Sequence, residues 1–267
     1  MQMFRHALFV LCFGLVMSLS APNAHASQRR FTYTYGSDVL TAGALEFEPW
    51  TTYRFGRDNF YSRLDHRLEF EVGLTDRLQS ALYFNFKAVT QDEDAARVTE
   101  FEWGGISWEW KYKVLDAVAD PVGFAVYFEP TMATHESEVE AKLIVDKRLG
   151  DFYVAFNAVV EHEWIYEEQG ETERELVVEL DLGAAWFLTS ELSAGVEVRN
   201  HTFLPEGKLA SSALFAGPAI SYATGPWWVT MTVLPQLPAL KKNDTGSTFI
   251  LDEHERFAAR LLVGFDL

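Results

Sequence analysis

The fold is decided by stretches such as Leu64–Leu74, whose sequence is LDHRLEFEVGL. Apolar and charged residues alternate there, with Leu68, Phe70, Val72 and Leu74 on one side and Asp65, Arg67, Glu69 and Glu71 on the other. Successive side chains of a β-strand point to opposite faces, so this period of two predicts a strand with one apolar and one charged face. The pattern recurs from residue 44 to the end of the chain and predicts an all-β protein.

Twelve segments carry this pattern. Their approximate bounds are 44–55, 61–74, 78–90, 100–114, 122–133, 139–149, 152–166, 174–187, 192–203, 211–222, 227–237 and 255–267. The connections largely alternate between short turns (75–77, 150–151, 189–191, 223–226) and longer polar stretches (91–99, 167–173, 204–210, 238–254), and only 115–121 is long where a short turn is expected. Such alternation is typical of an antiparallel outer-membrane β-barrel with short periplasmic turns.

Parity defines where the barrel begins. Twelve strands from Ala44 return the end of the chain to the side on which the barrel starts, as in single-chain bacterial barrels. Residues 30–43 have an alternation of their own, in Phe31, Tyr33 and Tyr35, but a thirteenth strand would break the parity. We therefore expect residues 27–43 to be an N-terminal extension and residues 44–267 to be the barrel. The sequence leaves open whether the extension plugs the lumen.

Strand length favours a membrane barrel over a soluble β-sandwich or a lipocalin-like barrel, which alternate in the same way with the apolar face inside. Many predicted strands reach or exceed the length of about 9–11 residues that a tilted strand needs to cross a membrane. Near the strand ends, the apolar face carries aromatic residues that suit interfacial girdles: Tyr53, Phe55, Trp164, Trp186, Tyr222 and Trp227. The last strand ends on the apolar Leu267, as signals for the barrel-assembly machinery usually do.

The first 26 residues predict export. Arg5 and His6 precede the apolar stretch 7–19, and Ala24-His25-Ala26 matches the cleavage site of a secretory signal peptide. The alternative is an uncleaved helical anchor, for which the apolar stretch is short. The only cysteine, Cys12, lies in this segment, so the mature chain is expected to have no disulfide and no zinc-thiolate site.

The negative net charge of the chain argues against nucleic acid as a partner. The chain has 22 Lys and Arg against 39 Asp and Glu, a net charge of −17, and a polyanion such as nucleic acid would be repelled. No histidine cluster has metal-ligand spacing, so we predict no metal and no cofactor. Acidic residues gather in three predicted loops, at Asp92-Glu93-Asp94, Glu136 with Glu138, and Glu167-Glu168 with Glu171. Such loops are ordinarily solvated, and the alternative is that divalent cations bridge them to lipopolysaccharide. Outer-membrane lipid, the assembly machinery, and small solutes or ions are the other expected partners.

Generic barrel motifs carry a family resemblance. Together with the signal peptide, the motifs Gly73-Leu74-Thr75-Asp76-Arg77-Leu78, Trp110-Lys111-Tyr112-Lys113 and Gly217-Pro218 resemble those of uncharacterised proteobacterial outer-membrane barrels. Some of these carry the label "phenol-degradation pathway outer-membrane protein". The resemblance covers essentially the whole mature chain. It implies a barrel in the outer membrane of a Gram-negative cell and transfers no catalytic residue.

The charged face is the candidate functional site. Its lumen-lining candidates are Glu46, Glu48, Arg54, Asp65, Arg67, Glu69, Glu71, Lys87, Glu109, Lys111, Lys113, Glu129, Lys142, Arg148, Glu161, Glu163, Glu179, Asp181, Glu197, Arg199 and Arg260, and the same face includes Glu140, Asp146, Glu175 and Asp266. So many charges require salt bridges or water, because an isolated buried ion costs several kcal/mol.

Three functions follow from such a lumen. The leading prediction is a porin-like transport channel for small solutes with a preference for cations. The alternative is a structural or surface-interaction barrel whose lumen is sealed by ion pairs. The third is an outer-membrane lipid hydrolase, which needs a nucleophile beside a base. His201 is its best candidate base, but Ser193 is distant along the same strand and the His-x-Ser-Asn arrangement of barrel hydrolases is absent, so no enzyme is predicted.

Overall fold

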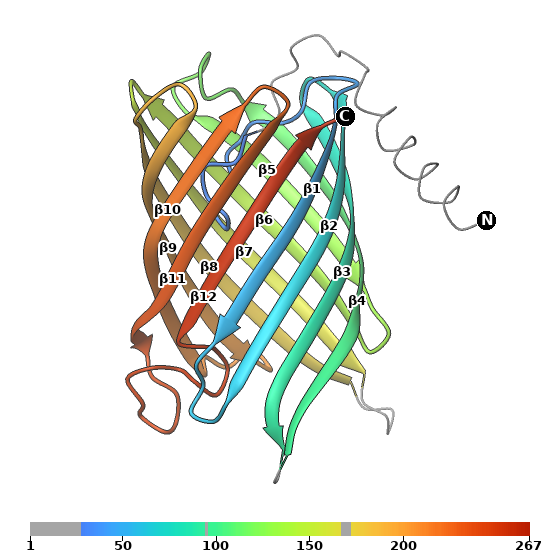
Figure 1. Cartoon of the computed structure of the whole chain (residues 1–267), viewed down its shortest axis with the longest axis vertical. Coiled ribbons are helices and arrows are strands. Elements are labelled where there is room, and N and C mark those ends of the chain that lie inside the picture. The colour runs from blue at the N-terminus through green and yellow to red at the C-terminus, as the bar shows by residue number, and fades with distance from the viewer. Residues whose placement is uncertain (1–27, 94–95, 167–171) are drawn as a thin grey trace, which may run out of the picture.

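The protein is a closed antiparallel β-barrel of twelve strands, as the sequence predicts (Figure 1). The computed structural model describes residues 28–93, 96–166 and 172–267. The predicted signal peptide, 1–26, and the acidic loop residues Asp94, Glu167, Glu168 and Glu171 lie outside the described residues. Among the described residues, no helix is long and apolar enough to cross a membrane.

The strands follow one another around the barrel. They are β1 (Leu45–Phe55), β2 (Tyr61–Thr75), β3 (Leu78–Glu93), β4 (Ala96–Leu115), β5 (Gly123–Met132), β6 (Glu136–Leu149), β7 (Phe152–Tyr166), β8 (Thr172–Phe187), β9 (Leu192–Pro205), β10 (Ser211–Thr224), β11 (Trp227–Lys241) and β12 (Phe257–Asp266). Each pairs with its neighbours in sequence, and β1 pairs with β12 to close the barrel, with Phe47 opposite Phe265. Closure leaves no strand edge unpaired.

Several strands extend further than the sequence pattern predicts. The polar stretch 91–99 was expected to be a loop, but β3 and β4 pair through most of it, with Asp92 opposite Arg97. An ion pair of 2.9 Å joins the side chains of these two residues. β11 likewise continues to Lys241, into the predicted loop 238–254. Exposed polar residues tolerate strand pairing beyond the membrane, where no apolar face is needed to mark the strand.

The long turn between β4 and β5 has its own internal bonds. Oδ1 of Asp116 accepts hydrogen bonds from the N–H groups of Val118 (2.9 Å) and Ala119 (3.2 Å). These bonds, with the ion pair to Lys113, hold the pKa of Asp116 below its ordinary value. The extra length forms a compact Asx-type turn.

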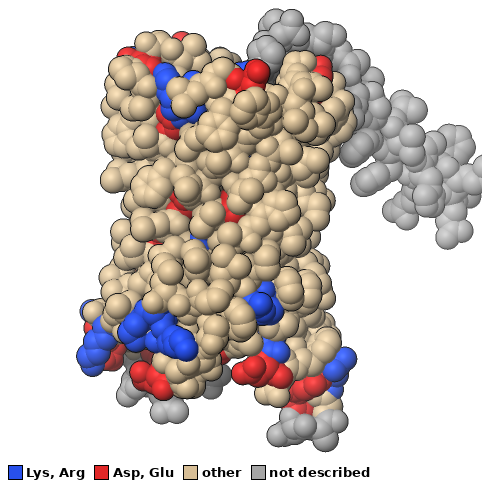
Figure 2. All heavy atoms as spheres, turned by 90° about the vertical axis from the view of Figure 1, so that its left-hand side faces the viewer, with Lys and Arg blue, Asp and Glu red and all other residues tan. Residues whose placement is uncertain are grey.

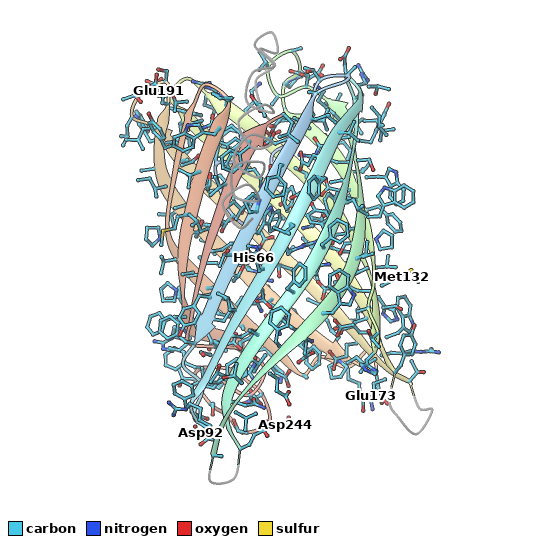
Figure 3. The ribbon with its side chains drawn as sticks, turned by 45° about the vertical axis from the view of Figure 1, so that its right-hand side comes forward. His66, Asp92, Met132, Glu173, Glu191 and Asp244 are labelled. Carbon is cyan, nitrogen blue, oxygen red and sulfur yellow. The ribbon has the colours of Figure 1, made fainter. Side chains whose placement is uncertain are left out.

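The outer surface is apolar around the middle of the barrel. On the face in Figure 2, Lys, Arg, Asp and Glu gather toward the two ends, and a broad band between them is almost free of charge. Large side chains are exposed on this band, such as Phe70 (46% exposed), Trp108 (52%) and Ile220 (51%). In Figure 3, Glu191 lies at one end, Asp92, Glu173 and Asp244 lie at the other, and His66 lies midway.

Exposed aromatic residues occur at both margins of this band. At the short-turn end, Trp186 is exposed and the rings of Tyr222 and Trp227 lie 5.8 Å apart. At the opposite end, the ring of Phe55 stacks on Phe257 at 5.3 Å. Of the six aromatics predicted for the girdles, Trp164 is the one that is only half-exposed. Such girdles mark the two interfaces of a transmembrane barrel.

The N-terminal segment, residues 28–43, lies inside the barrel. Phe31, Tyr33, Tyr35 and Leu40 are all buried, although the segment contributes no strand to the sheet. Gly183 in β8 makes room for it, because a side chain there would meet the ring of Phe31 at 2.4 Å. The protein core is therefore formed by this segment and the inner faces of the strands.

Candidate functional site

The N-terminal segment is held in the lumen by side chains of the wall. The carboxylate of Glu197 in β9 accepts hydrogen bonds from three successive backbone N–H groups, those of Thr32 (3.3 Å), Tyr33 (2.8 Å) and Thr34 (2.5 Å). Asn157 in β7 bonds both the N–H of Tyr35, at 2.7 Å, and its carbonyl, at 3.0 Å. These bonds satisfy the backbone polar groups that an irregular segment brings into a membrane barrel.

Arginines stack on the aromatic rings of this segment. The guanidinium of Arg29 lies 3.7 Å from the ring centre of Tyr35 and 4.8 Å from that of Trp50 in β1. Arg260 of β12 lies 3.7 Å from the ring of Tyr33. Burial acts to lower the pKa of Arg29, but the phenol of Tyr35 and the carboxylates of neighbouring glutamates hold it above its ordinary value. Arg29 thus keeps its charge inside the barrel.

The β11–β12 connection, residues 242–256, folds into the barrel from the opposite end. Ile250 is fully buried and packs in one apolar cluster with Tyr33 of the N-terminal segment and Leu234 of β11. Gln236 fixes its backbone, because its amide oxygen accepts from the N–H of Ile250 (2.7 Å) and its amide nitrogen donates to the carbonyl (3.0 Å). On this side of the lumen, a segment from each end of the barrel meets the other.

The predicted lumen residues lie on the inner positions of their strands. The buried ones are Glu46, Glu48, Glu69, Glu71, Glu109, Lys111, Glu129, Glu179, Asp181 and Glu197. The half-buried ones are Arg54, Asp65, Arg67, Lys87, Lys113, Lys142, Glu161, Glu163, Arg199 and Arg260. Arg148 is exposed beside the β6–β7 turn, where its Nε donates to the carbonyl of Gly150 at 3.0 Å. It therefore lies at the rim of the lumen.

Part of this set forms ion pairs across the lumen or along its wall. Arg67 of β2 pairs with Glu129 of β5 at 2.6 Å, across two intervening strands. Arg199 pairs with Glu179 on the adjacent strand. The other pairs within the set and its neighbours are Arg54–Asp65 (3.1 Å), Arg63–Asp65 (2.6 Å), Lys87–Glu102 (3.0 Å), Lys113–Asp116 (3.1 Å) and Lys142–Glu140 (3.0 Å).

The half of the lumen near the β1–β2 connection has walls of opposite charge. β6 and β7 place acids directly opposite each other, with Glu138 in register with Glu163 and Glu140 with Glu161. β1 and β12, which lie half-way around the twelve-stranded ring from β7, carry Arg54 and Arg260. A solute between these walls would experience a transverse field, and fields of this kind orient and select charged solutes.

A compact group of glutamates lies toward the short-turn end of the lumen, beside the N-terminal segment. Carboxylate oxygens of Glu46, Glu48 and Glu71 lie within 4.8 Å of one another, and so do those of Glu69, Glu71 and Glu109. All five side chains are at most 6% exposed. Two full charges at that separation repel each other by roughly 3.5 kcal/mol at an effective dielectric constant of about 20.

Sequence reasoning missed several lumen residues for identifiable reasons. Glu102 of β4 faces the lumen and pairs with Lys87. Between them and the middle of the strand, the β3–β4 register shifts at Asn85/Phe86, opposite Gly105, which has a φ of 88°. This bulge reverses which residues of β4 face inward. The Gly104-Gly105 pair was the available signal. Glu138 lies in a predicted loop, whereas β6 begins at Glu136, three residues before its predicted start, and so includes it. Arg29 could not be placed from periodicity, because its segment is irregular.

The histidine weighed as a catalytic base has a different neighbour. The ring of His201 packs edge-on against His254 of the β11–β12 connection, with 4.4 Å between ring centres. Ser193 lies eight positions away along β9, which corresponds to roughly 26 Å of extended strand. A serine at that distance is out of reach as a nucleophile for His201.

A family comparison covers nearly the whole chain. The family described as "Family of unknown function (DUF6662)" matches residues 23–267. No curated protein matches the sequence.

Solved outer-membrane barrels share the fold at low sequence identity. The COG4313 outer-membrane channel from Pseudomonas putida F1 is 13% identical, with a TM-score of 0.61, over 86% of this chain and 98% of that one. The NanC porin is 10% identical, with a TM-score of 0.56, over 83% and 100%. The translocator domain of the autotransporter NalP from Neisseria meningitidis is 12% identical, with a TM-score of 0.51, over 85% and 89%. The fold is therefore that of a bacterial outer-membrane barrel.

Proposed function

Because the chain belongs to this family of unknown function, DUF6662, we propose its function from the barrel itself: an outer-membrane channel that conducts small ions or polar solutes, prefers cations, and is held closed by its N-terminal segment. The proposal rests chiefly on how that segment is held. Wall side chains bond its backbone, and it adds no strand to the sheet. It can therefore leave without breaking the barrel.

The charge of the lumen supports a preference for cations. The acidic wall of β6 and β7 includes Glu138, Glu161 and Glu163, and none of these three takes part in an ion pair within the described chain. Rings and walls of carboxylates lower the barrier for cations and raise it for anions. The family resemblance and the fold comparison with a channel and a porin agree with this function.

A sealed structural barrel is the second candidate. It is favoured by the apolar cluster that contains both Ile250 of the β11–β12 connection and Tyr33 of the N-terminal segment. In that case the buried segment would be a permanent core that stabilises the wall. The two candidates differ in whether the segment leaves the lumen under any condition.

Planar-bilayer recording separates them. We expect small or infrequent cation-selective openings from the refolded wild-type barrel, and larger, more frequent ones from Glu197→Ala, which removes the acceptor of three N–H bonds. Glu191→Ala, at an exposed turn, is the matched control and should behave like the wild type. Silence from folded wild type and Glu197→Ala alike would contradict the channel and favour the sealed barrel.

A further inference from the structure

The five buried glutamates come from three strands on one side of the barrel, with β3 between two of them. Glu46 and Glu48 lie on β1, Glu69 and Glu71 on β2, and Glu109 on β4. The register sets Glu46 opposite Glu71 and Glu48 opposite Glu69. On β3, the small side chain of Ala81 lies between Glu71 and Glu109, so these two carboxylates approach each other over it. Like charges directly opposite one another in a sheet are destabilising, so the arrangement requires a compensating group.

The protein's own cations do not provide direct compensation. Among the described residues, no Lys or Arg nitrogen lies within 4.0 Å of a carboxylate oxygen of Glu48, Glu69, Glu71 or Glu109. Arg29 interacts electrostatically with Glu48 and Glu69, but beyond the 4.0 Å of an ion pair. Its guanidinium instead stacks on Tyr35 and Trp50.

Glu69 supplies an observation beyond the clustering itself. Its side chain is 0% exposed, and neither of its carboxylate oxygens has a hydrogen-bond donor in the described chain. Both oxygens are buried, and one of them lies within 4.8 Å of carboxylate oxygens of Glu71 and Glu109. A buried carboxylate without any donor is costly, because it has lost its water and gained no partner.

Hydrogen bonds from outside the cluster orient the remaining carboxylates. Nε1 of Trp228 donates to Glu46, Nε1 of Trp50 donates to Oε2 of Glu48 at 3.2 Å, and the hydroxyl of Tyr83 donates to Oε2 of Glu109. Oε1 of Glu48 and Oε2 of Glu71 are left without donors, as are the two oxygens of Glu69. Outer groups that fix the ligands of an ion in this way are typical of metal sites.

We propose that Glu69, Glu71 and Glu109 form a binding site for one divalent cation of the calcium type, with Glu46 and Glu48 beside them through the shared Glu71. All the ligand atoms are carboxylate oxygens, which hard cations prefer. Two oxygens that share a Ca²⁺ ion at about 2.4 Å each lie at most about 4.8 Å apart, and the oxygens of Glu69, Glu71 and Glu109 meet that limit. The ion would tie β2 to β4 across β3. The proposal does not depend on conduction.

Terbium luminescence tests the site in the folded, full-length barrel in detergent. Tb³⁺ takes the place of Ca²⁺, and the indoles of Trp50 and Trp228, which donate to Glu48 and Glu46 of the same cluster, should sensitise its emission. We expect saturable emission from the wild type that Ca²⁺ displaces. Glu69→Gln keeps the size of the side chain and should weaken Tb³⁺ and Ca²⁺ binding by roughly 10- to 100-fold. A gel shift on boiling shows that each variant is folded.

The matched control is Glu191→Gln, an exposed acid in the β8–β9 turn. It should bind Tb³⁺ like the wild type. The proposal is overturned if folded wild type shows no emission that Ca²⁺ displaces, or if Glu69→Gln and Glu191→Gln bind equally. It is also overturned if infrared spectra in saturating Ca²⁺ keep a protonated-carboxyl band that Glu69→Gln removes, because the cluster would then be balanced by protons.

Discussion

The backbone N–H of Tyr33 donates a hydrogen bond of 2.8 Å to Oε1 of Glu197, a residue 164 positions further along the chain. Thr32 and Thr34 donate to the same carboxylate. One wall residue thus binds the backbone of three successive residues inside the lumen, as an anion binds in a nest of successive N–H groups.

Removing that carboxylate should release the N-terminal segment. Glu197→Ala leaves three buried N–H groups without an acceptor, at a cost of about 1–3 kcal/mol each. We expect trypsin to cleave the folded barrel after Arg29 and Arg30 at least about tenfold faster than the wild type, since 1.4 kcal/mol is a factor of ten. The control Glu191→Ala should be cleaved at the wild-type rate, and equal rates for both variants would show that Glu197 does not hold the segment.

Filling the space at Gly183 should displace the segment by another route. A β-carbon there would lie 2.4 Å from the ring of Phe31, so Gly183→Val forces the ring out of its place. We expect larger bilayer conductance and faster cleavage at Arg29. Phe31→Ala in the same chain makes room for the valine and should reverse part of both effects. A double variant as open as Gly183→Val would argue against this steric explanation.

The β11–β12 connection should loosen in acid through His254. Burial, and then the charges of His201 and Arg199, hold the pKa of His254 well below its ordinary value of 6.5. Because the folded pKa is lower than the unfolded one, the inward position is fully stabilised above about pH 6.5 and loses stability as pH falls below it. Arg54 and Arg57 add to the repulsion of the protonated ring.

A spin label at Asp244→Cys reports this change, since Asp244 is exposed in the same connection. Its mobility should rise between about pH 7.5 and pH 5. His254→Gln should abolish the pH response, and His135→Gln, in the β5–β6 loop, should leave it intact. An unchanged response in His254→Gln would assign the transition to another group.

Cation preference should depend on the acidic wall. Glu138→Gln with Glu163→Gln neutralises one cross-strand pair and keeps its size. A charge at 4 Å contributes about 1 kcal/mol in water, so we expect the permeability ratio of cations to anions to fall by about fivefold. Reversal potentials in a salt gradient measure the ratio. Neutralising Asp151 and Glu191, which are exposed in turns between strands, should leave it unchanged, and an equal fall there would point to general surface charge.

Because β1 pairs with β12 and closes the barrel, we expect the folded protein to migrate differently on a gel before and after boiling. The two strands pair over most of their length, from Glu46 opposite Asp266 to Phe55 opposite Phe257. An unboiled sample in detergent should therefore run as a compact species on a gel, and boiling should shift it to the position of the unfolded chain. Replacing Leu262 with Pro removes an inward-facing residue and a ladder bond in the middle of β12. This variant should lose the compact band.

Much of the wall was readable from local pattern. A strand fixes its faces within a few residues, so Glu69 and Phe70 could be assigned to opposite faces without knowledge of the rest of the chain. The rule failed at Gly105, where a bulge reverses the phase, so Glu102 was not assigned to the lumen. It also gave no strand limit beyond the membrane, where β3 and β4 continue through polar residues.

The sequence by itself determined a twelve-stranded barrel with a charged inner face, because alternation, strand length and parity are properties of consecutive residues. Only the tertiary structure decided what occupies that lumen. Residues far apart in the chain are joined by the contact of Tyr33 with Glu197, by the apolar cluster that holds Ile250 and Tyr33, and by the convergence of Glu69 with Glu109. They depend on barrel closure, strand register and an irregular segment, and none of these leaves a periodic signal.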